Sequence, residues 1–234
     1  MRNIFLVLIL MIGFQPAYSQ LFSREKIKNL EDFDNKPWSW GYFLGLNTYD
    51  FKFEYAEEGL DVTLNKKIGF NVGLIGNMRI NEYLDLRLEP GVMFVDRELI
   101  FNEVTDPLWA DKNDRSVKST YIHVPLLLKV STKRYNNFKP FVEAGISTSW
   151  NLSSNEKNPD DNYAGEFRMK THTYYWEVGF GIDLYLFYFK FTPSIRGVFA
   201  LSDELVRDNR PDSQFTGNID KMMSRGVFLN FKFQ

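Results

Sequence analysis

The chain contains no cysteine and only two histidines among its 234 residues. Without cysteine, an exported protein of this size has no disulfide bond to stabilise it. The formal net charge is −2 and the pI is about 5.8, so the chain lacks the strongly basic field that nucleic-acid binding requires. These absences exclude disulfide scaffolds and nucleic-acid-binding proteins.

Long hydrophobic runs are also missing, except for one at the N-terminus. Residues 4–14 are apolar apart from Gly13, and they follow the short positive start Met1-Arg2-Asn3. Ala17-Tyr18-Ser19 then offers small residues at the positions that a signal peptidase reads. Residues 1–19 are therefore predicted to be a signal peptide, cleaved before Gln20.

The remaining sequence excludes a helical membrane protein. The N-terminal run has 11 residues, whereas a membrane-spanning helix needs about 20. No later run approaches that length, and the mean hydropathy is −0.31. Since no cysteine follows the run, a lipoprotein anchor is excluded as well. A β-barrel stays possible, because its polar lumen and loops dilute the hydropathy.

What the sequence has in quantity is aromatic residues, at 17%, and two-residue alternation. Near the C-terminus one parity is apolar, with Val227, Leu229, Phe231 and Phe233, and the other holds Phe228, Asn230, Lys232 and Gln234. A period of two marks a strand with two different faces. The same rhythm recurs through most of the chain in segments of 10–15 residues.

Eight such segments can be read, at residues 40–55, 68–78, 84–94, 122–130, 142–152, 174–184, 187–201 and 225–234. Short connections (residues 81–82, 132–138 and 185–186) alternate with long ones (residues 56–65, 96–118, 153–170 and 202–224). An even number of strands with this alternation predicts an all-β fold. We expect an eight-stranded antiparallel transmembrane β-barrel with short periplasmic turns and long outer loops.

The barrel is predicted to occupy residues 38–234, preceded by a periplasmic lead-in at residues 20–37. The lead-in is polar, and either a short helix or a disordered tail is consistent with its sequence. In the first strand the apolar parity changes from even positions, ending at Leu46, to odd positions, beginning at Tyr49. A slip of one residue predicts a β-bulge, which we place at residues 47–48.

Charged residues share the parity that faces inward in this arrangement: Asp85, Arg87, Glu89, Lys129, Glu143, Glu177, Asp183, Lys190 and Arg196. Exposing Arg or Lys to lipid at the midplane would cost ~2–4 kcal/mol each. An eight-stranded barrel is just wide enough for side chains to fill. Because the signs are mixed, we expect a lumen network of salt bridges, and a plugged interior in place of an ion-conducting pore.

The sequence offers no catalytic constellation. A lipid-modifying barrel would need a Ser–His–carboxylate arrangement near its rim, but no serine is spaced informatively from His123 or His172. The acidic stretch at residues 155–162 lacks EF-hand spacing and is interpreted as a solvated loop. We therefore expect no enzyme activity, no cofactor and no metal. Trp109 could anchor a partner or pack its own loop.

Three segments resemble the outer-membrane β-barrel family common in Bacteroidetes: residues 86–94 (LRLEPGVMF), 121–129 (YIHVPLLLK) and 139–145 (KPFVEAG). Residues 40–52 (WGYFLGLNTYDFK) resemble more particularly the PorT family. That resemblance implies an outer-membrane accessory of the type IX secretion system, which exports proteases, adhesins and, in gliding species, motility proteins. The family supplies no catalytic residues to carry over.

The resemblance also implies the partners, namely membrane lipid and other secretion-system proteins, with no small-molecule substrate. Two alternatives stay open. The first is a monomeric outer-membrane barrel with a structural or adhesive role. The second is a lipid-modifying barrel enzyme, which would need a serine or an acid beside His123 or His172 at the rim.

Overall fold

The computed structural model describes residues 28–57, 62–102, 104, 113–210 and 212–234. The predicted signal peptide, the first part of the predicted lead-in and Trp109 lie outside the described residues. The described helices are two short 3-10 turns, η1 (Phe33–Asn35) and η3 (Asn162–Ala164). Neither has the length or apolar character to cross a membrane.

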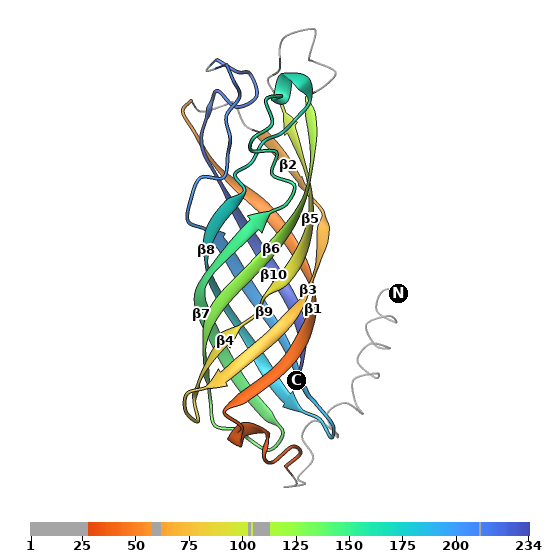
Figure 1. Ribbon diagram of the computed structural model, residues 1–234, viewed down its shortest axis with the longest axis vertical. Coiled ribbons are helices and arrows are strands. Elements are labelled where there is room, and N and C mark those ends of the chain that lie inside the picture. Colours follow the sequence, from red (N-terminus) through yellow and green to blue (C-terminus); the bar gives the residue numbers. More distant parts are fainter. Residues whose placement is uncertain (1–27, 58–61, 103, 105–112, 211) are drawn as a thin grey trace, which may run out of the picture.

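Ten antiparallel strands form one sheet: β1 (Trp38–Tyr55), β2 (Val62–Lys66), β3 (Ile68–Arg79), β4 (Leu84–Leu88), β5 (Gly91–Phe101), β6 (Asp114–Ser131), β7 (Phe138–Asn151), β8 (His172–Tyr185), β9 (Lys190–Ala200) and β10 (Ile219–Phe233). The last strand, β10, pairs with β1, which closes the sheet into a barrel (Figure 1). Since β2 continues into β3 and β4 into β5, the ring has eight strands. The predicted fold is confirmed.

Short turns join the strands at one end of the barrel, at residues 80–83, 132–137 and 186–189. At the other end the strands run farther than the sequence predicted. Residues 62–65, 96–101, 114–118 and 219–224, which were assigned to outer loops, belong to β2, β5, β6 and β10. The loop prediction was wrong there because the outward positions are polar, so the segments read as loops although they alternate.

The bulge predicted at residues 47–48 is wrong. β1 stays in continuous register with β10 from the Tyr42–Phe233 pair to the Glu54–Lys221 pair. Odd positions face inward along this whole length, and Asn47, Tyr49 and Phe51 are all buried. What changes along β1 is therefore the surroundings of the strand. The outward side chains of β1 are apolar before residue 47 in the sequence, and the inward side chains are apolar after it.

A bulge does lie on the neighbouring barrel strand, between β2 and β3. Lys66 pairs with Arg97, and Phe70 pairs with Phe94. The segment from residue 66 to residue 70 is therefore one residue longer than the segment of β5 that it faces. Lys67 is thus the extra residue. Such an insertion turns consecutive side chains to the same face and bends the strand.

The two faces of the barrel wall exchange their polarity along its length. An apolar belt covers the exterior of the half with short turns, and its exposed members include Leu44, Leu46, Leu74, Phe94, Val142, Ile146, Phe180 and Ile195. Nearer the long loops, the exterior carries a polar collar made of Asp50, Lys52, Glu54, Lys66, Lys67 and Arg225. Inside this collar lies an apolar core: Phe51, Leu99, Phe101, Val117, Phe167, Met169, Leu205, Phe215, Ile219 and Met222.

This exchange predicts where lipid ends on β1. Leu46 and Lys52 are both exposed on the outer face of the same strand. We expect a cysteine at position 52 to react with a water-soluble maleimide in sealed vesicles, and a cysteine at position 46 to stay unlabelled, because only the belt lies in lipid. The chain has no native cysteine to interfere. Labelling of both positions would place the membrane boundary lower on β1.

Candidate functional site: the closed lumen

The structure places all nine charged residues predicted for the lumen inside the barrel, each at most 9% exposed. They come from β4, the β4–β5 connection and β6 to β9. Two further residues lie among them, Lys232 on β10 and His123 on β6. Because the strands alternate over the stretches that carry these residues, every second side chain there faces the narrow interior. The charges form two layers.

The central layer has three carboxylates and three cations: Glu89, Glu143, Glu177, Arg87, Arg196 and Lys232. Glu89 is its hub, since its carboxylate lies 2.6 Å from Lys232 Nζ and 2.9 Å from Arg196 Nη1. Arg87 Nη1 lies 3.5 Å from the same carboxylate, and Lys232 Nζ is also 3.2 Å from Glu143. Equal numbers of opposite charges allow this layer to be buried without an unpaired ion.

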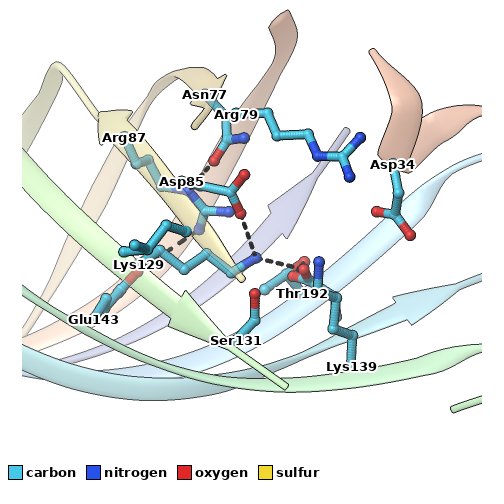
Figure 2. Close-up of polar contacts among 12 residues, drawn as sticks. Asp34, Asn77, Arg79, Asp85, Arg87, Lys129, Ser131, Lys139, Glu143 and Thr192 are labelled. Atoms are coloured by element: carbon cyan, nitrogen blue, oxygen red, sulfur yellow. Dashed lines mark hydrogen bonds and ion pairs between the residues drawn. The ribbon is translucent and has the colours of Figure 1, made fainter. Parts of the chain in front are cut away.

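The second layer lies nearer the short turns, with Asp85 and Asp183 facing Lys129 and Lys190. A third buried lysine, Lys139, lies beside this layer. Lys129 contacts Asp85 at 4.0 Å (Figure 2) and also pairs with Asp183. Thr192 donates a hydrogen bond of 2.7 Å to Asp183. The guanidinium of Arg87, in the central layer, also donates to Asn77 Oδ1 at 3.1 Å (Figure 2). The lumen is therefore filled by ion pairs over both layers.

The described part of the predicted lead-in lies across the end with short turns. Arg134 donates to the carbonyl groups of Asn29 and Leu30, and its guanidinium stacks 3.7 Å from the ring centre of Tyr185. The Tyr185 hydroxyl donates to Asp34 at 2.6 Å. Between this segment and the lumen charges lies a polar cavity of about 20 Å³, which is room for a water molecule.

Two loops close the opposite end, and we call them the cap: residues 152–171, and residues 201–210 with 212–218. Arg168 donates to the backbone of residues in both loops, at Asn158 and Arg207. Asp208 accepts hydrogen bonds from the side chains of Asn162, Ser213 and Thr216. The cap also contributes apolar side chains to the core inside the collar: Phe167, Met169, Leu205 and Phe215.

The cap changes the interpretation of the acidic stretch at residues 155–162. Most of this stretch is exposed, but Asp161 and Asn162 are buried and connect the two loops. The prediction of a solvated loop is wrong at these two positions, because the stretch faces a second loop as well as water. Within the described ranges, no group of His, Cys, Asp and Glu side chains is arranged to hold a metal ion.

A third polar cluster, just below the cap, was missed from the sequence. Arg97 donates to the Tyr121 hydroxyl at 2.8 Å and to Ser224 Oγ at 3.2 Å. Glu204 accepts from the backbone N–H and the hydroxyl of Ser224, at 3.1 and 2.9 Å. Burial raises the pKa of the Glu204 carboxyl above its usual value. Arg97 and Glu204 were assigned to outer loops. The sequence did contain a signal for Arg97, which has the same parity as Leu99 and Phe101.

The two histidines lie in different surroundings. His123 is inside the lumen, with Nε2 2.7 Å from a Glu177 oxygen. His172 begins β8, with Nε2 2.9 Å from Thr148 Oγ1 and its ring against Trp150. In the part of the chain that the structure describes, neither histidine is hydrogen-bonded to a serine, as a Ser–His–carboxylate arrangement requires.

The filled lumen leads to an expectation for ion flow. We expect planar-bilayer recordings of the purified barrel to show little steady current, because paired side chains occupy both charge layers and the cap covers the far end. A barrel of known large conductance, recorded in the same bilayers, controls for insertion. Large and stable openings would contradict this and favour a channel.

Comparison with protein families agrees with the architecture. A family model described as "Outer membrane protein beta-barrel domain" matches residues 18–206. No curated protein sequence matches the chain. Among solved structures, OprG from Pseudomonas aeruginosa is 17% identical, with 83% of this chain and 95% of that chain covered and a TM-score of 0.44. Neisserial surface protein A is 10% identical, covering 84% and 98%, with a TM-score of 0.40.

Proposed function

The chain belongs to the family of outer-membrane β-barrel proteins, and from this starting point we propose that it serves type IX protein secretion as an accessory that acts through protein–protein contacts. It resides in the outer membrane, where its apolar belt contacts lipid. In this proposal it neither conducts ions nor catalyses a reaction.

The observation that supports a contact role is the closed interior. Two layers of ion pairs occupy the lumen, and the lead-in and the cap cover its two ends. Because the interior is closed, partner proteins can contact the surfaces of the barrel but nothing can pass through its lumen. The available surfaces are the lead-in on the periplasmic side and the collar and cap on the outer side.

The secretion role itself rests on the likeness of residues 40–52 to the PorT family. These residues lie in β1. Its inward members Phe43 and Asn47 are buried in the lumen, and its outward members Leu44 and Leu46 are exposed on the belt. A role in secretion would therefore be exerted by the assembled barrel as a whole.

The experiment that tests this role is deletion of the chain. In the deletion strain we expect cargo of the type IX system to remain inside the cell and to disappear from the medium, with export restored by the intact chain. The Ala variants of His123 and His172 should restore export equally well, because no chemistry is assigned to them. Removing residues 23–35 should impair export while the barrel still assembles, as judged by heat-dependent mobility in gels.

A structural or adhesive barrel is the second candidate, and the same experiment separates the two. If the deletion strain exports cargo normally, the secretion role is rejected. A loss of surface attachment or of envelope integrity in that strain, with export intact, would favour the second candidate.

A further inference from the structure

The barrel wall contains a seam near its outer end, between β1 and β2. Below this point β1 pairs with β3 as far as the Thr48–Ile68 pair. Above it, the described strand pairing joins β1 only to β10, and β2 only to β5. We define the seam by the facing strand edges at residues 50–54 and 62–66. The bulge at Lys67 lies at its base.

Two other strand edges near the outer end of the barrel form backbone hydrogen bonds with loops. The outer edge of β10 is covered by the cap, where the Glu204 N–H donates to the Met222 carbonyl at 2.8 Å. The outer edge of β6 is met by Leu152, whose N–H donates to the Thr120 carbonyl at 2.8 Å. Each of these two edges thus receives a backbone hydrogen bond from a neighbouring loop, at Met222 and at Thr120. An uncovered edge presents N–H and C=O groups that can pair with another strand.

Side chains bridge the seam at its two ends. Lys66 Nζ lies 2.9 Å from Asp50 at the base, and the Val62 N–H donates to the Tyr55 hydroxyl at 3.0 Å near the top. Between them, Phe53 and Leu64 are only partly buried against the core. The Lys66 side chain is 51% exposed, and ion pairs as exposed as this one contribute little to stability. Opening the seam therefore disrupts few contacts.

We propose that the seam receives one extended segment of a partner protein, which completes the wall by strand addition. The segment would have about five residues, the length of β2. Its apolar side chains would point inward beside Phe53 and Leu64, and its polar side chains outward beside Asp50 and Lys52. Main-chain hydrogen bonds would supply the affinity. This inference goes beyond the secretion role and does not depend on it.

Deletion of Lys67 provides a closed-seam variant. Removing the extra residue restores strict alternation from β2 to β3 and keeps Val62 and Leu64 facing inward, so β2 can continue the ladder with β1. A second variant, Lys52→Cys with Thr63→Cys, closes the seam by a disulfide, because both side chains lie on the outer face of the wall. Its reduced form is a matched control with the same sequence, because the chain has no other cysteine.

The test is to select binders from a displayed library of random seven-residue peptides, using the mature barrel in lipid nanodiscs. We expect binders in which apolar and polar residues alternate. Deletion of Lys67, the closed disulfide, and N-methylation of alternate peptide nitrogens should each weaken binding about tenfold or more. Bound peptide should slow amide hydrogen exchange at residues 50–54 and 62–66.

Several results would overturn the proposal. One is a library that yields no binder, and another is binders that tolerate N-methylation or bind the closed variants equally well. Protection of the cap in place of the seam would also reject it. If the barrel alone forms dimers that the closed disulfide abolishes, the occupant is a second copy of this chain, and the partner segment is rejected.

Discussion

Replacing Glu89 by Gln should destabilise the barrel more than any other single change in the lumen. The carboxylate lies within 3.5 Å of Lys232, Arg196 and Arg87, and all four side chains are fully buried. Gln keeps the shape but leaves three cations facing two carboxylates in the central layer. Removing one partner of a buried ion pair costs about 3–5 kcal/mol, so reversible urea unfolding in lipid vesicles should show a loss of that order.

Two controls separate this effect from a general loss of charge. Glu54→Gln removes an exposed carboxylate that also contacts two cations, Lys52 and Lys221, and it should leave the unfolding free energy nearly unchanged because water screens the pair. Adding Lys232→Met to Glu89→Gln should recover part of the loss, since the central layer is neutral again. Equal losses for Glu89→Gln and Glu54→Gln would mean that the lumen is wet.

The sequence was sufficient for the barrel and for the content of its lumen. Alternation is a local property, so each strand reveals its two faces without knowledge of its neighbours. Asp85, Arg87 and Glu89 can be assigned to the interior from β4 and the residues that follow it alone. Their partners cannot, because the ion pair between Glu89 and Lys232 joins residues 143 positions apart. Only the register between strands brings these two side chains together.

The outer part of the barrel was misread for a different reason. Alternation says that a strand has two faces, but it does not say which face is in contact with lipid. Along β1 the wall passes from lipid into water, and the apolar side chains change sides at this boundary without any slip in register. The same ambiguity hid Arg97, which has an inward position on β5 although its neighbours Asp96 and Glu98 read as a polar loop.

Phe51→Ala should therefore cause a large loss of stability, the second largest that we expect. Phe51 is 3% exposed inside the collar, and the Arg97 guanidinium lies 3.9 Å from its ring centre. Truncating a buried Phe typically costs about 3–5 kcal/mol, because a cavity remains where the ring was packed. Urea unfolding in vesicles measures the loss.

Phe94→Ala is the matched control, because Phe94 is 48% exposed on the apolar belt. Lipid chains can fill the space that its ring leaves, so no cavity persists and the loss should be much smaller than for Phe51. Similar small losses at both positions would contradict this. They would mean that Phe51 faces lipid and that the membrane-embedded wall continues past residue 51. A large loss at Phe51 alone would place the end of the membrane-embedded wall between Leu46 and Phe51, where the polar collar begins.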